Sequence, residues 1–363
     1  MRIFIAATSL HPSYGGPAYS VAGLAAALAR AGTQVGLWAA DQSADPASFA
    51  GPANLQLLSG GAAGALRGFD CDLLHDNGLW MAHNHRLAVL AARRRIPRVV
   101  STRGMLEPWA LRHKRLKKSL AWRLYQRRDL RRAQLLHATA EGEAAHLAAL
   151  QLGVPVCTIP NGVDVPDLRR HEPTTGGEAR TALFLGRIYP VKGLPLLIEA
   201  WSQMRPPGWR LEIAGPDEAG HRGEVERAVA RAGLDDVVSF SGPLEGQAKH
   251  DAYARAALFV LPSHSESFGM AAAEALAHGV PVLTTTGTPW RGLAERGCGW
   301  SVAPSADAIA QGLRLATAQP PEALRVMGAQ GRAWVAAEFS WEKVAADFLA
   351  AYERLLRQPA LLR

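Results

Sequence analysis

The 363-residue chain carries 40 Lys and Arg against 32 Asp and Glu, which gives a formal net charge of +8. Hydrophobic residues make up 48% of it and charged residues 20%, proportions that exclude an intrinsically disordered protein. It has no apolar run approaching the roughly 18 residues of a membrane-spanning helix, and it is longer than one hydrophobic core usually supports. We therefore expect a globular protein with two domains.

The N-terminus starts with an apolar run, Met1–Ala7, which passes directly into a polar stretch. Because no small-residue cleavage site follows it, we interpret this run as a buried strand rather than a secretion signal, and we expect a cytoplasmic protein. The three cysteines, Cys71, Cys157 and Cys298, are far apart and odd in number. They indicate reduced structural thiols and give no metal-ligand spacing.

Short β-rich runs alternate with helix-like runs in the first half of the chain, a pattern typical of a parallel sheet with crossover helices. The predicted strands are Arg2–Ala7, Gln34–Ala39, Leu73–His75, Arg98–Ser101, Leu135–Ala138 and Val156–Ile159. The predicted helices are Ala18–Ala31, Asn84–Arg94 and Glu141–Leu150. We assign residues 1–165 to this first doubly wound domain.

The positive charge is concentrated in the segment Arg112–Arg132, where ten basic residues accompany one acidic residue, Asp129. Such a patch indicates an anionic partner, with membrane lipid, a phosphorylated acceptor and nucleic acid as the candidates. The segment also contains Leu116, Leu120 and Trp122, so it predicts a helix at an anionic membrane surface. A solvated helix is the alternative. Nucleic acid is disfavoured, because the aromatic residues do not follow a known RNA-binding pattern.

The alternation of strands and helices restarts after Asp164–Gly177, whose prolines and glycines predict a linker over residues 166–178. The predicted strands of the second doubly wound domain, residues 179–340, are Thr181–Gly186, Arg210–Ala214, Val237–Phe240, Leu258–Pro262 and Val280–Thr284. Apolar spacing predicts an amphipathic helix over Trp341–Leu356, and we expect residues 341–363 to pack back toward the first domain. Ligands of such sheets bind at the carboxyl ends of the strands, so we expect the chemistry in those loops.

The most informative loop follows the predicted strand that ends at Pro262. A helix starts near Gly269, and its free N–H groups suit a phosphate, while carboxylates suit sugar hydroxyls. Glu266 falls in the loop and Glu274 in the helix, because two residues eight apart lie about 80° apart around a helix and cannot share one face. By spacing alone, a capping Glu266 and a solvated Glu274 are the alternative.

This block of Glu266-Ser267-Phe268-Gly269 with Glu274 resembles the Glu-x7-Glu signature of the retaining glycosyltransferases of family GT4. The resemblance covers nearly the whole chain. It implies the GT-B fold, in which two Rossmann-like domains face each other across a cleft, and a nucleotide-sugar donor held by the C-terminal domain. It also implies that Glu274 binds the ribose and that Glu266, a candidate catalytic residue, holds the donor sugar. Further expected donor contacts are Phe268, Gly269, Met270 and Ala271, with Leu244 near the base.

A second block, Gly186-Arg187 through Lys192-Gly193, is similar to the family's Gly-Arg…Lys-Gly loop and follows the first strand of the second domain. Arg187 and Lys192 are suited to neutralise a donor diphosphate and the charge that develops on the leaving phosphate. As an isolated pair they would be an ordinary surface loop. The resemblance makes both of them candidate catalytic and donor-binding residues.

The first domain contributes weaker candidates. Gly15 and Gly16 follow the first strand and resemble the family's Gly-Gly loop, where the backbone approaches a phosphate or sugar closely. Tyr14, His75 and Trp80 are candidate acceptor contacts, although a structural role for His75 is an equal alternative.

Two positions depart from the family pattern. Many relatives carry a histidine where this chain has Arg103, and a guanidinium cannot serve as a base. Either Arg103 acts catalytically by stabilising the departing phosphate, or the donor orientation differs. Trp290 stands where relatives often have a glutamate, which leaves the contacts there open.

The resemblance implies hexose transfer with retention and without a metal or other cofactor, from a UDP- or GDP-sugar to a glycan or polyprenyl-diphosphate-linked acceptor. Asp70-Cys71-Asp72 comes closest to a metal-binding Asp-x-Asp sequence and is interpreted as the start of a strand. Bacterial surface polysaccharide synthesis (lipopolysaccharide, O-antigen or exopolysaccharide) at the inner face of the cytoplasmic membrane is the expected setting. The alternatives are a transferase for a soluble small acceptor, a two-domain sugar-nucleotide epimerase and a nucleic-acid-binding protein.

Overall fold

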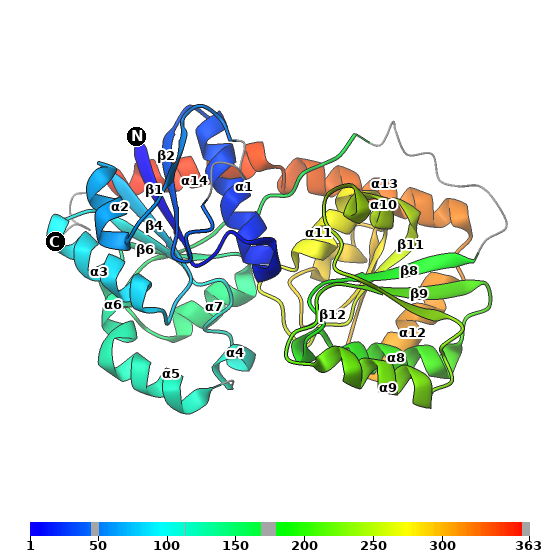
Figure 1. Cartoon of the computed structure of the whole chain (residues 1–363). Helices are drawn as coiled ribbons and strands as arrows, with labels where there is room; N and C mark the ends of the chain where they lie inside the picture. The colour runs from blue at the N-terminus through cyan, green and yellow to red at the C-terminus, as the bar shows by residue number, and fades with distance from the viewer. Residues whose placement is uncertain (45–50, 113, 168–178, 358–363) are drawn as a thin grey trace. The chain divides into compact units, whose positions relative to one another are not determined.

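The computed structural model describes residues 1–44, 51–112, 114–167 and 179–357 (Figure 1). The chain forms two compact units, Met1–Gly162 with Trp341–Arg363, and Val163–Ser340. The first boundary therefore lies three residues before the predicted one at 165. Most of the predicted linker, residues 168–178, lies outside the described residues. Among the described residues, the structure contains no helix long and apolar enough to span a bilayer.

The first unit is built on a parallel seven-stranded sheet with the order β3-β2-β1-β4-β5-β6-β7. Its strands are β1 (Arg2–Ala7), β2 (Gln34–Ala39), β3 (Leu55–Leu58), β4 (Leu73–Asn77), β5 (Arg98–Ser101), β6 (Leu135–Ala138) and β7 (Val156–Thr158). The central strands β1 and β4 are buried along almost their whole length because both faces of the sheet are covered. Six of these strands lie where the sequence predicts them, whereas β3, a short edge strand, was not predicted.

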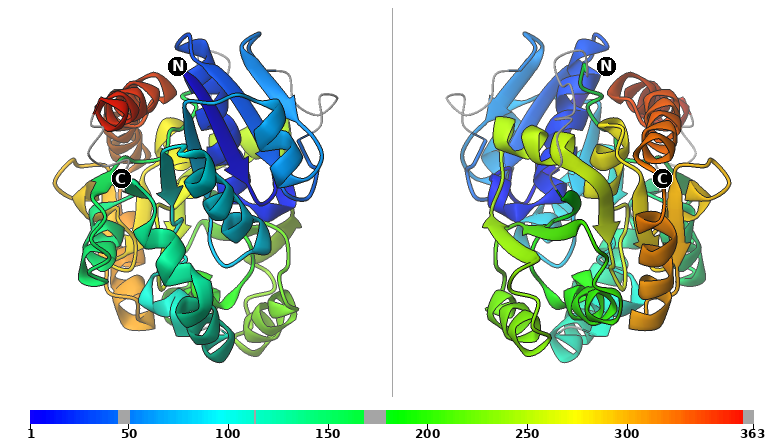
Figure 2. Two further views of the ribbon diagram at one scale, coloured as in Figure 1. Left: turned by 90° about the vertical axis from the view of Figure 1, so that its left-hand side faces the viewer. Right: turned by 90° about the vertical axis from the view of Figure 1, so that its right-hand side faces the viewer.

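Helices cover both faces of this sheet (Figures 1 and 2). They are α1 (Gly16–Arg30), α2 (Ala62–Gly68), α3 (Ala82–Arg94), α4 (Pro108–Arg112), α5 (Arg115–Ala121), the π-helical turn η2 (Trp122–Gln126), α6 (Arg127–Arg131), α7 (Glu141–Ala149) and α14 (Trp341–Leu356). The predicted C-terminal helix, α14, packs against α1 in the first unit. Trp341 lies directly on Gly23 and Gly162, where an added Cβ would come within 2.1 and 2.2 Å of its ring.

The second unit holds a parallel six-stranded sheet with the order β10-β9-β8-β11-β12-β13. The strands are β8 (Arg180–Leu185), β9 (Trp209–Ala214), β10 (Val238–Gly242), β11 (Ala256–Leu261), β12 (Val282–Thr285) and β13 (Gly299–Val302). The helices are α8 (Leu194–Met204), α9 (His221–Arg231), α10 (Gly246–Arg255), α11 (Met270–Ala277), α12 (Ala306–Thr317) and α13 (Pro321–Glu338). The five predicted strands are present, and β13 was not predicted.

The helices of the second unit also form two layers, with α8, α9 and α12 on one face and α10, α11 and α13 on the other (Figure 1). Both sheets therefore have the doubly wound arrangement predicted from the alternating pattern. In each sheet the strand order reverses once, between β1 and β4 in the first unit and between β8 and β11 in the second.

Candidate functional site

The loops after β8 and β11 meet at the point where the strand order of the second sheet reverses. Open parallel sheets bind their ligands at this position, because neighbouring loops diverge there and leave a crevice. The two loops pack closely: the His264 amide donates to the Val191 carbonyl at 2.8 Å. Gly193 has a φ of +67°, and an added Cβ would lie 2.1 Å from the Pro262 carbonyl oxygen. Glycine is therefore required after Lys192.

Lys192 and Glu266 form an ion pair between these two loops. The Lys192 Nζ donates to Glu266 Oε1 at 2.6 Å, and their side chains are only 15% and 11% exposed. The Ser263 hydroxyl donates to the same carboxylate oxygen at 2.7 Å. Glu266 thus holds the ammonium group in a fixed place at the end of the sheet, and the two predicted site residues are brought together.

The chain then enters α11 through Gly269, which has a φ of +82° and precedes the first helical residue, Met270. Gly269, Met270 and Ala271 are partly accessible, whereas the Phe268 side chain is buried. Backbone N–H groups at the start of a helix carry partial positive charge and favour an anion.

Trp290 supports this turn through a hydrogen bond and through packing of its ring. Its indole Nε1 donates to the Phe268 carbonyl at 2.6 Å, and the residue is only 2% exposed. Its ring packs against Phe268 and Phe339, with both centroids 5.3 Å away. The departure from the family pattern at this position is therefore structural: the indole fixes the loop that precedes α11.

Glu274 lies one to two turns into α11 and accepts two hydrogen bonds from α10. Lys249 Nζ donates to Oε1 at 2.7 Å and the Tyr253 hydroxyl donates to Oε2 at 2.8 Å. Burial, together with the Glu274 carboxylate, raises the pKa of Tyr253 well above its usual value, so the hydroxyl stays a donor. The alternative of a solvated Glu274 is wrong, because its side chain is 16% exposed and paired.

Arg187 does not join Lys192 in the described contacts. Its guanidinium pairs with Glu218, and both side chains are about two-fifths exposed. Each of the two cations therefore has its own carboxylate partner, Glu218 for Arg187 and Glu266 for Lys192. Leu244 lies after β10 and packs, partly buried, against the core of the unit.

The first unit has its own small pocket at the reversal point between β1 and β4. Tyr14 and Arg103 line it, together with the backbone turn at Gly78. Gly15, with a φ of +78°, precedes α1, which begins at Gly16. The Gly-Gly loop and Arg103 therefore lie near one edge of this sheet, as the sequence predicts.

Arg103 is held by three polar side chains. Its guanidinium donates to Asn77 Oδ1 at 2.7 Å, to Asn161 Oδ1 at 2.6 Å and to the Ser20 hydroxyl at 3.2 Å. Burial lowers the pKa of Arg103 to about 10, with the Glu143 carboxylate opposing the shift, and the group remains protonated at neutral pH. Its cationic form fits the role of a charge stabiliser and excludes that of a base.

Glu143, which sequence analysis missed, fixes the backbone around Arg103. The buried carboxylate accepts from the Thr102 hydroxyl and from the Gly104 amide, both at 2.6 Å, and from the amide and hydroxyl of Thr139. This bracing holds Arg103 at a φ of +53°, which a non-glycine residue seldom adopts. No spacing pattern could have linked Glu143 to Thr102 and Gly104, because these two partners lie far from it in sequence, in the loop after β5.

For His75, the structure favours the structural alternative over contact with an acceptor. His75 is completely buried, and its ring nitrogens are 2.6 Å from the Tyr352 hydroxyl and 2.6 Å from the Ser101 hydroxyl. Trp80 is not among the residues that line the pocket. Its ring packs against Trp122 at 6.4 Å instead.

Comparison with known proteins identifies the family. Residues 167–334 match the family described as glycosyl transferases group 1, and residues 15–162 match the glycosyl transferase 4-like domain. The chain belongs to the group 1 glycosyltransferases. The GT-B class and the GT4 family expected from the sequence are confirmed.

Three similar proteins illustrate this relationship. D-inositol 3-phosphate glycosyltransferase of Actinosynnema mirum is 35% identical over 61% of this chain and 57% of its own length. Sucrose-phosphate synthase of Thermosynechococcus elongatus superposes with a TM-score of 0.79 at 21% identity, over 98% of this chain and 99% of that one. Anabaena HepE in complex with UDP and glucose superposes with a TM-score of 0.71 at 19% identity, over 98% of this chain and 100% of that one. The chain thus spans a little over half the length of this first curated relative, and the two solved structures share its fold.

Proposed function

We propose that this glycosyltransferase transfers a hexose from a nucleotide diphosphate sugar with retention of anomeric configuration and without a metal. The observation that supports it is the Lys192–Glu266 pair at the reversal point of the second sheet, beside the start of α11. A diphosphate at this position would receive the Lys192 ammonium and the N–H groups that follow Gly269. The solved relative with UDP and glucose favours a uridine nucleotide, and GDP is the second candidate.

Each side chain then has a distinct role. Glu274 accepts from the ribose hydroxyls, and Glu266 orients Lys192 and contacts the donor sugar. Arg187 exchanges its exposed partner Glu218 for a donor phosphate. In the first unit, Arg103 carries the charge suited to a leaving phosphate but cannot remove a proton. The acceptor proton therefore passes to the donor phosphate oxygen on the same face of the sugar.

For the acceptor, we propose a glycan or a polyprenyl-diphosphate-linked glycan, used in bacterial surface polysaccharide synthesis on the inner face of the cytoplasmic membrane. Three exposed leucines on the basic segment support contact with a membrane: Leu116, Leu120 and Leu124. A soluble phosphorylated acceptor is the second candidate, because the curated relative is named for D-inositol 3-phosphate. Activity on extracted lipid-linked acceptor, lost when lipid is removed, favours the first. Activity undiminished by the removal of lipid favours the second.

The donor assignment is tested through Lys192. UDP, GDP, ADP and their sugars are first screened for a rise in melting temperature, because a ligand of the folded state stabilises it. With the donor so identified, Lys192→Ala should lower kcat by roughly a hundredfold or more, the scale of losing one preorganised charge in an active site.

Lys343→Ala provides the matched control, since it removes the same charge from the exposed surface of α14. Its kcat should equal that of the wild type. Near wild-type turnover in Lys192→Ala, or no nucleotide that raises the melting temperature, would refute the proposal.

A further inference from the structure

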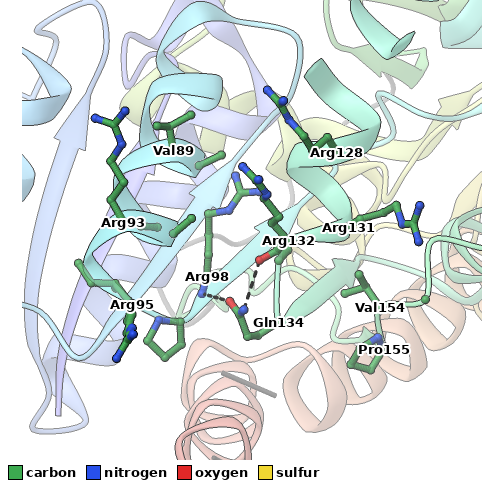
Figure 3. A pocket seen from close by; sticks show the side chains of 17 residues that line it. Val89, Arg93, Arg95, Arg98, Arg128, Arg131, Arg132, Gln134, Val154 and Pro155 are labelled. Carbon is green, nitrogen blue, oxygen red and sulfur yellow. Dashed lines mark hydrogen bonds between the residues drawn. The ribbon is translucent and has the colours of Figure 1, made fainter. Parts of the chain in front are cut away.

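A groove of about 850 Å³ opens at the amino-terminal edge of the first unit's sheet (Figure 3). The end of α3, the end of α6 and the loop before β7 form its walls. The Arg103 pocket lies at the opposite, carboxyl edge of the same sheet. Four-residue strands such as β5 separate the two edges by roughly 13 Å, so the groove is separate from the candidate site.

Arginine dominates the groove. Five exposed arginines line it, and they are Arg93, Arg95, Arg128, Arg131 and Arg132. No Asp or Glu is found among the described residues of the lining. Within the described ranges, none of these five guanidinium groups forms an ion pair with a carboxylate. The groove therefore concentrates positive charge that the protein itself does not neutralise.

The groove has a fixed floor. The Arg98 amide donates to Gln134 Oε1 at 2.8 Å, and Gln134 Nε2 donates to the Arg132 carbonyl at 3.2 Å (Figure 3). The Arg98 guanidinium is buried, pairs with Asp76 at 3.1 Å and donates to the Asp129 carbonyl. The end of α6 is thus held at the start of β5, and Arg128, Arg131 and Arg132 project from this braced surface.

Helix polarity explains part of this arrangement. The C-terminal end of a helix favours one or two cations, and both α3 and α6 end here. Two such ends bordering one concave surface place like charges near one another, which costs free energy unless an anion is present. Planar guanidinium groups bind phosphate oxygens in pairs, which makes phosphate the anion that this set fits best.

We propose that this groove binds a ligand that carries two or more phosphate groups. A single phosphate engages one or two guanidinium groups, whereas the arginines of the groove come from two helices and so suit a longer anion. Both free polyphosphates and the headgroup of a diphosphatidyl lipid such as cardiolipin offer this chemistry. The site is independent of the proposed donor site, which lies in the other unit.

The test uses the full chain and two probes, tripolyphosphate measured by calorimetry and phosphatidylcholine vesicles with or without cardiolipin measured by flotation. In Arg93/Arg131/Arg132→Gln, binding of the effective probe should weaken on the order of tenfold or more. Loss of tripolyphosphate binding identifies a free polyphosphate as the ligand, and loss of cardiolipin-dependent flotation alone identifies a lipid headgroup.

Arg210/Arg227/Arg231→Gln is the control, since it removes the same charge from exposed residues of the second unit, outside both the groove and the basic segment. Its affinity for the probe should stay within about twofold of the wild type. If the two triple variants lose equal affinity for the probe, the attraction comes from net charge alone and the proposal is overturned. Failure of both probes to bind the wild type would also overturn it. Loss of binding in Lys192→Ala would assign the anion to the donor site and also overturn it.

Discussion

Trp290 is the residue that most changes the interpretation of the second unit's site. Its indole donates to the Phe268 carbonyl while its ring lies among aromatic side chains. A buried carbonyl left without a donor costs about 1–3 kcal/mol. This hydrogen bond therefore helps to position the loop before α11, together with the Glu266 amide, which donates to the Gly287 carbonyl at 3.0 Å.

Trp290→Phe should keep most of the packing and remove the donor. We expect the free energy of unfolding of the second unit to fall by about 2–3 kcal/mol, from the unpaired carbonyl and the smaller ring. The affinity for nucleotide sugar should weaken as well, because Phe268 and Gly269 lose their support. Urea unfolding and calorimetric titration with the donor measure the two effects.

Trp334→Phe is the comparison, since Trp334 belongs to the same aromatic cluster but its indole bonds to Glu338 at the surface. This variant should lower the free energy of unfolding by less than Trp290→Phe does, and it should leave the affinity for the donor unchanged. If the two variants lose equal affinity, the hydrogen bond to Phe268 is not what positions the loop.

At the scale of elements, the basic segment forms successive helical pieces, α5, η2 and α6. Leu116, Leu120 and Leu124 recur every four residues and are 86%, 60% and 64% exposed. Residues four apart are neighbours on a helix surface, so the three leucines form a slanted row along it. An exposed leucine stripe among arginines and lysines is typical of helices that lie in a membrane interface.

Leu116/Leu120/Leu124→Gln should reduce flotation with phosphatidylglycerol vesicles at least about tenfold, because burial of each leucine contributes on the order of 1 kcal/mol. Leu315→Gln is the control, since Leu315 is also exposed, at 56%, but lies on α12 of the second unit. Unchanged flotation of the triple variant would contradict the membrane contact.

At the scale of the whole molecule, α14 returns from the end of the second unit and joins the first through a buried chain of hydrogen bonds. His137 Nε2 is 2.7 Å from the Ile159 carbonyl, so this nitrogen must donate, and Nδ1 accepts from the Ser101 hydroxyl. Ser101 in turn accepts from His75 Nε2, and His75 Nδ1 accepts from Tyr352 of α14. In this arrangement one nitrogen of each histidine ring accepts a hydrogen bond, so both histidines must be neutral.

This chain of hydrogen bonds predicts that the first unit loses stability in acid. Burial lowers the pKa of His137 to about 4, helped by the Arg103 charge and opposed by Glu143 and the Ile159 carbonyl, and burial also lowers the pKa of His75. The unfolded state then binds more protons between about pH 6.5 and 4, so stability falls as the pH falls through that window. The loss should reach about 3 kcal/mol from His137 alone, measured as faster hydrogen exchange in β4, β5 and β6.

His137→Gln should be less stable at pH 7 but lose less stability on acidification. His11→Gln, a change at an exposed residue of the same unit, should keep the wild-type pH slope. An unchanged slope in His137→Gln would show that this histidine does not carry the proton linkage.

Local patterns in the sequence were sufficient to predict most of the strands and the family. Apolar runs and their spacing predicted eleven of the strands, and the block around Glu266 indicated the family. These features depend on residues near one another in the chain. The short edge strand β3 and the strand β13 lack a strong local pattern, and both were missed.

The partner of each site residue was decided by tertiary structure alone. Lys192 meets Glu266, Arg103 meets Asn77 and Asn161, and His75 is enclosed by α14, all through contacts between segments distant in sequence. A sequence specifies which side chains can carry charge or accept a proton. Only the packed sheet decides which of them are buried, because burial and pairing arise when distant strands and helices come together.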